Sequence, residues 1–314
     1  MAASVLGKRV RDWKKLDEAH MRRGELVTVF FSTDGPAFAP AEKTGARGRA
    51  RVYSEATIEA LLVAKLVLRL SLRAVEGFAQ GMARLAQAAW PVPDYTTLCR
   101  RERTLEVELG TVRDPGKKQV LIVDSTGLKV FGEGEWKVRV HGTDGKRRTW
   151  RKLHLLVDRE TGQIIAAEVT DGSAHDAPVL ERLLPQDLSN TVVLGDGAYH
   201  TKSLHKLVHA RGGTLLSPPP KNARVWKGYS QRKEDRAFAF RNSQLTPLQR
   251  LGRTAWKVKT GLSQRSFVEC TNNRLKSITG GHVSAREDER QEVELRLRCK
   301  LINFLAVPGQ SLRA

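Results

Sequence analysis

The sequence predicts an α/β protein in which a mixed sheet is flanked by helices and preceded by an all-α region. Two observations favour this fold class. Residues 51–112 carry apolar side chains at helical spacing. From residue 113 onward, short apolar runs typical of strands alternate with amphipathic segments typical of helices. The turn-rich string RDPGKKQ, residues 113–119, is the expected boundary between the two regions.

The N-terminal region is expected to hold an arm, residues 1–50, followed by three helices. Ser54 is a plausible N-cap for a first helix that runs to about residue 70. A second helix follows and ends at Pro91. Asp94 caps a third, which we expect to continue through residue 109.

The third predicted helix carries several basic side chains in its early turns. A helix, a short proline-containing turn and a basic helix together resemble a helix-turn-helix module that reads DNA. On this interpretation Arg100 and Arg101 contact DNA in a helix-turn-helix-like region formed by residues 51–112. The alternative is a helical hairpin with a solvated basic face that binds nothing.

The region from residue 113 to 314 is expected to be one α/β domain with a basic insertion at about residues 221–242. The predicted strands are 120–126, 150–158, 163–170, 191–195 and 214–216. The predicted helices are 175–184, 202–210, 243–259, 263–278 and 285–304. Three strands, a crossover helix, a strand, a helix and a strand indicate a mixed sheet covered by helices.

The charge balance indicates a polyanionic partner. Lys and Arg number 54 against 34 Asp and Glu, a formal charge of +20, and the sequence pI is about 10.3. Residues 221–276 hold 14 basic and three acidic side chains. Aromatic residues interleaved with these charges favour a folded basic surface, and a solvated charge run is the alternative.

Other classes of protein are disfavoured by what the sequence lacks. It has no apolar run of about 18 residues to span a membrane, and its N-terminus has no apolar segment for secretion. The three cysteines show no zinc or disulfide spacing. We therefore expect a bacterial-type cytoplasmic protein.

Three acidic residues are the candidate catalytic groups. Asp124 and Asp196 lie at or near the ends of apolar, strand-like runs, and Glu269 lies in a basic amphipathic segment. A buried carboxylate needs compensation, and Mg²⁺ provides it because hard cations prefer oxygen ligands. Two such ions can activate water and stabilise a leaving oxygen at phosphorus. The alternative is a turn aspartate at 196 and a solvent-facing glutamate at 269.

Further cations and one aromatic residue are candidates for DNA contact. A basic cluster surrounds the second predicted strand, where a DNA backbone would pass, and Trp136 could stack on an unpaired base. Core packing and a solvated hairpin are the alternatives. The candidates in these segments are Arg147, Arg148, Arg151, Lys152, Lys221 and Trp136.

Several strings resemble the DDE transposases of bacterial insertion sequences, family-five type. They are VDSTGLKVFGEGEWKVRVHG, KRRTWRKLHLLVD, GDGAYHT, PPKNAR and the spacing of Arg265, Glu269 and Lys276. The resemblance covers nearly the whole chain. It implies a ribonuclease H-like core and two Mg²⁺ ions, with Mn²⁺ as a substitute. The catalytic, metal-binding carboxylates map onto Asp124, Asp196 and Glu269.

The resemblance also implies a reaction and its partners. The protein would hydrolyse a phosphodiester at each transposon end and transfer the freed 3′-OH to target DNA. Its partners would be double-stranded DNA, as terminal inverted repeats and as target, and further copies of itself in a homo-oligomer. A cytoplasmic, nucleoid-associated location in a bacterium follows. Spaced along a helix, Arg265, Glu269 and Lys276 would share roughly one face, so the two cations could hold phosphates beside the metal.

Two positions depart from the family pattern. Leu262 stands at the tyrosine position before Arg265, and His200 stands where relatives commonly carry Asp. The departures favour weakened DNA positioning over abolished chemistry. They leave open a transposase-derived DNA-binding regulator with impaired catalysis. A structure-specific nuclease on the same core would not explain the helical N-terminal region or the charge.

Overall fold

The computed structural model describes residues 52–87, 90–110, 117–130, 150–226 and 236–306, with Met21, Glu25 and Ala41 as isolated positions. The predicted arm, residues 1–50, otherwise lies outside the described residues. The chain divides into two compact units. The sheet unit holds the described residues of 117–128 and 150–274, and the helical unit holds those of 52–110, 129–130 and 275–306.

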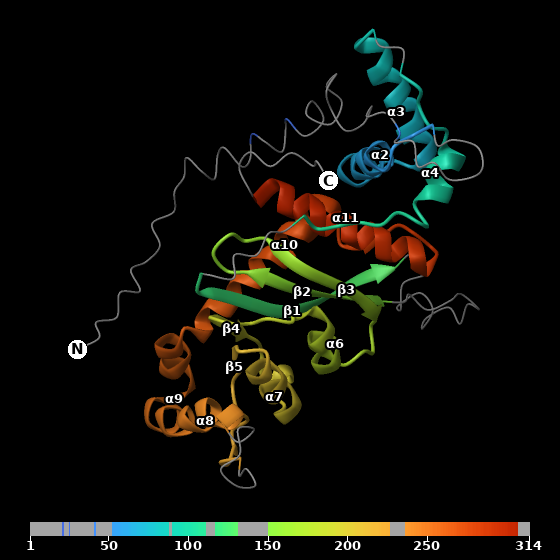
Figure 1. The fold of residues 1–314 in the computed structure, drawn as a ribbon. Helices are drawn as coiled ribbons and strands as arrows, with labels where there is room; N and C mark the ends of the chain where they lie inside the picture. Colours follow the sequence, from blue (N-terminus) through green and yellow to red (C-terminus); the bar gives the residue numbers. More distant parts are fainter. Residues whose placement is uncertain are drawn as a thin grey trace, which may run out of the picture. The chain divides into compact units, whose positions relative to one another are not determined.

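A mixed sheet forms the centre of the sheet unit (Figure 1). Its strands are β1 (Gln119–Val130), β2 (Trp150–Asp158), β3 (Ile164–Asp171), β4 (Thr191–Leu194) and β5 (Thr214–Leu216). They lie in the order β3-β2-β1-β4-β5. β4 runs parallel to both β1 and β5, and β2 runs antiparallel to β3. This topology confirms the predicted fold class, a ribonuclease H-like mixed sheet flanked by helices.

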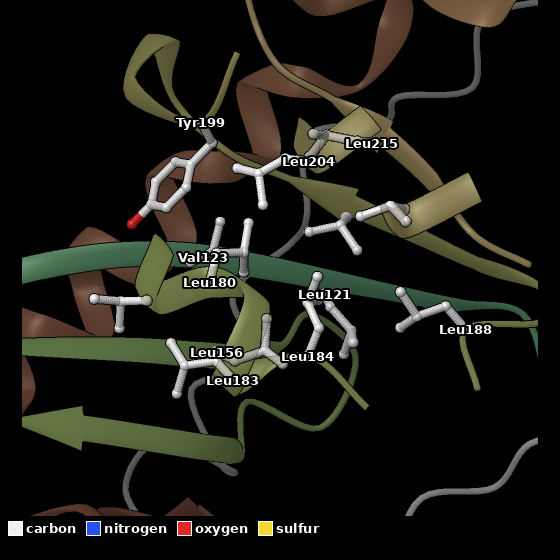
Figure 2. Close-up of a cluster of buried hydrophobic side chains, with 13 residues drawn as sticks. Leu121, Val123, Leu156, Leu180, Leu183, Leu184, Leu188, Tyr199, Leu204 and Leu215 are labelled. Atoms are coloured by element: carbon white, nitrogen blue, oxygen red, sulfur yellow. The ribbon is translucent and has the colours of Figure 1, made fainter. Parts of the chain in front are cut away.

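One face of the sheet is covered by α6 (Asp176–Leu183) and α7 (Lys202–Ala210). Their apolar side chains pack with those of β1, β2, β4 and β5 in one buried cluster (Figure 2). Leu121 and Val123 of β1 both belong to this cluster. Since neighbouring residues of a strand point to opposite faces, Ile122 and Asp124 face the other side of the sheet.

The segment after β5 contains more helix than the sequence predicts. Its elements are α8 (Arg236–Ser243), α9 (Leu245–Thr260), the short 3₁₀ helix η4 (Leu262–Arg265) and α10 (Ser266–Thr279). The predicted helices 243–259 and 263–278 correspond to α9 and to η4 with α10. The backbone of α9 breaks at Gly252, whose φ of 73° is a conformation that glycine adopts without strain.

The helical unit contains α2 (Glu55–Leu68), α3 (Leu72–Leu85), α4 (Tyr95–Arg101) and α11 (Asp288–Ala306). The predicted caps are confirmed at two helices: Ser54 Oγ accepts a hydrogen bond from the Thr57 amide at 2.9 Å, and Asp94 Oδ1 accepts one from Thr97 at 2.7 Å. The short β6 (His282–Val283) pairs with the last residues of β1.

The third predicted helix is wrong in its length, because α4 ends at Arg101 and not near residue 109. Glu102 is buried there and forms an ion pair with Lys65 of α2 at 2.5 Å. Beyond it, Leu105 and Val107 are buried while the residues beside them are exposed or half-buried. Burial that alternates in this way is typical of an extended chain, so packing against α2 ends the helix early.

A buried ionic network anchors α11. Arg298 and Glu294 are each about 1% exposed and form an ion pair at 2.5 Å. Glu294 also accepts hydrogen bonds from the backbone amides of Ser284 and Ala285, and Arg298 donates to two backbone carbonyls. These bonds compensate for the desolvation of both charges. In the part of the chain that the structure describes, no helix is long and apolar enough to cross a membrane.

Candidate active site

Asp124 projects from the middle of β1, on the face opposite α6 and α7. Its side chain is 17% exposed. Asn272 of α10 donates a long hydrogen bond of 3.4 Å to Asp124 Oδ2. The helix that carries Glu269 therefore lies against the strand that carries Asp124.

Asp196 lies two residues beyond the end of β4, after Gly195. In the parallel pairing of β1 and β4, Ile122 lies opposite Leu194, and two further residues along each strand bring Asp124 level with Asp196. Asp196 caps a 3₁₀ turn and accepts a hydrogen bond from the Ala198 amide at 2.8 Å. Asp124, within β1, and Asp196, just beyond β4, thus lie level with each other at the carboxyl end of β4, where sites of α/β folds form.

Arg265 contacts both Glu269 and Asp124. Arg265 Nη2 lies 2.6 Å from Glu269 Oε1, and Arg265 Nη1 lies 3.6 Å from Asp124 Oδ1. The guanidinium therefore lies between the two carboxylates and partly neutralises both. Arg265 and Glu269 are one turn apart, the spacing at which helical side chains meet.

The electrostatics of Asp124 link the three acids. Burial raises its pKa, Arg265 lowers it, and the charges of Asp196 and Glu269 raise it again; the pKa that results is about 6. Charges that raise the pKa of Asp124 in this way lie close enough to interact with it. Residues separated by more than 70 positions in the sequence thus lie near one another in the fold.

The type of these side chains fits a divalent cation. Carboxylate oxygens are the ligands that Mg²⁺ prefers, and a cation would stabilise the charged form of Asp124. As they are arranged here, no three acidic, histidine or cysteine side chains among the described residues lie close enough together to hold one ion. The Arg265 guanidinium lies between Asp124 and Glu269 and contacts both. The residues fit the ion in chemistry.

Two buried polar residues beside the carboxylates were missed in the sequence. The Oδ1 atom of Asn272 and the hydroxyl of Tyr199 are both buried without a hydrogen-bond partner among the described residues. Burial raises the pKa of Tyr199 well above its usual range, and Asp124 and Asp196 raise it further. Tyr199 lies at one end of the apolar cluster (Figure 2). Two features of the sequence could have identified these residues. Tyr199 lies in the string GDGAYH, and Asn272 follows Glu269 by one helical turn.

The other predicted DNA-contacting residues lie in varied surroundings. Arg100 is exposed on α4, whereas Arg101 pairs with Glu55 at 2.7 Å. Arg151 and Lys152 of β2 form ion pairs with Asp171 and Asp176 respectively. Lys221 is exposed, and Lys276 is half-buried on α10, two turns after Glu269. Trp136, Arg147 and Arg148 lie outside the described residues.

The two positions that depart from the family pattern both contribute to packing. Leu262 is 3% exposed and begins η4, the turn that carries Arg265. His200 is half-buried, and its Nδ1 lies 3.0 Å from the hydroxyl of Ser217. Among the described residues, no ion pair or hydrogen bond joins either side chain to the three carboxylates.

Comparison with known proteins identifies the family to which the chain belongs. A family model described as a transposase DDE domain matches residues 115–304, more than half of the chain, and a second model of the same description matches residues 21–133. Among solved structures, the Drosophila P element transposase strand transfer complex is 10% identical, with 90% of this chain and 85% of that chain covered and a TM-score of 0.31. The Mos1 transposase paired-end complex with left transposon end is 11% identical, with 95% and 90% covered and a TM-score of 0.23. The match over the sheet, both aspartates and α10 shows that this chain belongs to the DDE transposases, enzymes that cleave and join DNA strands with the help of divalent metal ions.

Proposed function

We propose that this protein is the transposase of a bacterial insertion sequence. It hydrolyses the phosphodiester at each transposon end and transfers the freed 3′-OH to target DNA. Asp124, Asp196 and Glu269 are the catalytic and metal-binding residues, and two Mg²⁺ ions, or Mn²⁺ in their place, are the cofactors. A bacterial cytoplasmic, nucleoid-associated location accords with this role.

The observation that carries the proposal is the convergence of the three carboxylates. Asp124 and Asp196 lie level with each other on neighbouring parallel strands, and Arg265 connects Asp124 to Glu269. The charges of Asp196 and Glu269 raise the pKa of Asp124, so their proximity does not stabilise the fold. Such an arrangement is typical of a site at which a cation or a reacting group supplies the missing compensation.

The residues of the chain have separate roles in this proposal. The ions, when bound, would activate water and stabilise charge at the scissile phosphate. Asp124 and Asp196 hold them from the edge of the sheet. Arg265, once it leaves the carboxylates, is a free guanidinium at the site, and a guanidinium binds phosphate through two parallel hydrogen bonds. Lys276 lies further along the same helix and would contact the adjacent backbone.

The charge supports DNA as the partner. A formal charge of +20 favours binding to a polyanion, and that binding should weaken steeply as salt is added because phosphate neutralisation releases counterions. We propose that this positive charge binds both the transposon ends and the target DNA. Because one reaction joins two ends, the active form would be a homo-oligomer on DNA.

The proposal is tested by cleavage and binding measured side by side. Labelled duplexes that carry the inverted repeats flanking the gene are incubated with Mg²⁺, and end nicks and joined products are followed. Asp124→Asn, Asp196→Asn and Glu269→Gln are each expected to abolish both products and to leave binding intact. Asp187→Asn, which changes an exposed aspartate in a loop, is the matched control and should retain activity.

The outcomes separate the candidate functions. Cleavage that survives any of the three active-site substitutions would refute the assignment of that residue. Specific binding by the wild-type protein without any cleavage, in either Mg²⁺ or Mn²⁺, would favour a transposase-derived regulator.

A further inference from the structure

A second site lies in the sheet unit, beside the turn that carries Asp196. It is a pocket of about 640 Å³. Gly197, the residue after Asp196, belongs to its wall. Prolines form an apolar side, and basic and aromatic side chains form the rest. Besides Gly197 the lining residues that matter here are Pro219, His200, Arg224, Trp226, Arg241 and Arg253.

The central cation of the pocket is Arg241, which comes from α8 and is only 3% exposed. Its guanidinium carbon lies 4.1 Å from the ring centroid of Trp226, so the two groups stack. Nε donates to His200 Nε2 at 3.2 Å. Nη1 donates to the carbonyl of Arg224 at 2.6 Å and to Asn242 Oδ1 at 3.0 Å. Within the described residues Nη2 donates no hydrogen bond, and it is left for a group in the pocket.

The surroundings of Arg241 are built to hold it in place. Asn242 accepts a hydrogen bond from the Trp226 amide and donates one to the Trp226 carbonyl, each at 3.0 Å. Phe238 packs edge-on against Trp226, with ring centroids 5.2 Å apart. These contacts fix both the indole and the arginine, so the guanidinium is pre-positioned.

Within the described residues, every partner of Arg241 is neutral. None of the described carboxylates lies within ion-pair distance of it or lines the pocket. His200 is a neutral partner, because burial and the nearby Arg241 lower its pKa to about 4, which keeps the ring uncharged at pH 7. A buried cation that has only neutral partners is costly unless an anion joins it.

The other charged residues that line the pocket, among those the structure describes, are basic. Arg253 donates to the Pro219 carbonyl at 2.8 Å, and Arg224 is exposed. Lys202 Nζ lies 6.0 Å from the Trp226 ring. The pocket therefore combines one fixed guanidinium, two more arginines and an apolar wall. An anion whose neighbours are apolar matches this lining, and a phosphodiester next to its sugar is such an anion.

We propose that this pocket binds a backbone phosphate of the DNA strand that passes the active site. Arg241 Nη2 would donate to the phosphate, with Arg253 and Arg224 at the rim, and the proline wall would pack on the adjoining sugar. The proposal rests on the proposed function, because the strand it holds is the one that reaches Asp196.

A matched pair of substitutions at His200 tests the proposal. In His200→Glu a carboxylate replaces the ring nitrogen that Arg241 contacts, and it would pair with the guanidinium in place of the ligand. His200→Gln is the neutral control of the same length. Introducing an ion pair for a buried cation should leave the fold intact, and thermal unfolding of both variants verifies this.

Binding of a short labelled duplex is measured in EDTA at a series of salt concentrations. One phosphate contact contributes about 0.9 to the slope of log affinity against log salt. We expect His200→Glu to lower that slope by about 0.9 and to weaken binding about tenfold at low salt. His200→Gln should keep the slope of the wild-type protein. Because no metal is present, a failure of the proposed chemistry does not affect this readout.

An equal slope for the Glu and Gln variants would overturn the proposal. Titration of inorganic phosphate, followed by tryptophan fluorescence, then identifies the alternative: if phosphate binding is lost in His200→Glu although the two slopes are equal, the pocket holds a free anion and not DNA.

Discussion

Replacing Asp124 by Asn should stabilise the metal-free protein at neutral pH. The carboxyl group has an ordinary pKa of 3.8, which the fold raises to about 6. Between these values the folded protein holds a proton that the unfolded chain has released, so stability falls as the pH rises through this window. Above pH 6 the full cost applies, and it amounts to about 3 kcal/mol because each pH unit is worth about 1.4 kcal/mol. Asparagine carries no charge and avoids it.

The measurement is urea unfolding of the wild-type and Asp124→Asn proteins in EDTA from about pH 3.5 to pH 8, conditions that bracket both pKa values. The variant should gain up to about 3 kcal/mol at pH 8. The difference should vanish below pH 4, where the aspartate is protonated in both states, so the low-pH data are the internal control. A variant that is no more stable than the wild-type protein at pH 8 would refute the electrostatic reasoning about this site.

Three further predictions concern the buried ionic network of α11, a helix cap and the glycine before Asp196. Glu294→Gln leaves its buried arginine partner unpaired and should cost about 3 kcal/mol in urea unfolding, whereas Glu287→Gln, in an exposed ion pair, should leave the unfolding midpoint nearly unchanged; equal destabilisation by the two would contradict this. Ser54→Ala should cost about 1 kcal/mol through the lost cap, and Ser54→Gly only a few tenths. Gly195→Ala should cost about 2 kcal/mol in thermal unfolding, because its Cβ would lie 2.9 Å from the ring of Tyr199; an unchanged melting temperature would show that the ring yields freely.

Local patterns account for much of the fold. β2, α7 and β5 have the predicted bounds. In α7 the reason is that Thr201 provides a side-chain cap and that Leu204 and Val208, four residues apart, are both buried. The apolar stripe predicted along α11, from Val293 to Leu305, is also buried in the structure. Where a segment buries one continuous face, its periodicity is a reliable signal.

The errors occur where tertiary contacts override the local pattern. α8 was not predicted, because RAFAFRNS alternates apolar and small residues as a strand does; in the structure Phe238 is buried and Phe240 is exposed. α4 is shorter than predicted because Glu102 is held by Lys65, a residue 37 positions earlier. A contact between residues so far apart in the sequence cannot be predicted from the composition of the segment itself.

The chemistry of the site could be predicted, but its geometry could not. Residue type and local setting single out the three acids, and a helical spacing of four brings Arg265 to Glu269. That the same guanidinium also approaches Asp124 depends on how α10 crosses the sheet. The pocket around Arg241 depends on contacts between three separate segments, and the single-sequence signal for it was only a basic stretch with interleaved aromatic residues.

The position of Arg265 implies an order of events at the carboxylates. For Arg265 to bind a DNA phosphate through two parallel hydrogen bonds, its guanidinium would have to give up part of its contact with Asp124 and Glu269. The two acids would then be left less compensated, and their affinity for a divalent cation would rise. On the proposed function, metal and DNA should therefore bind with positive coupling, and by linkage each should strengthen the other by the same factor. Such an enzyme would hold its metal more firmly when a DNA strand is in place.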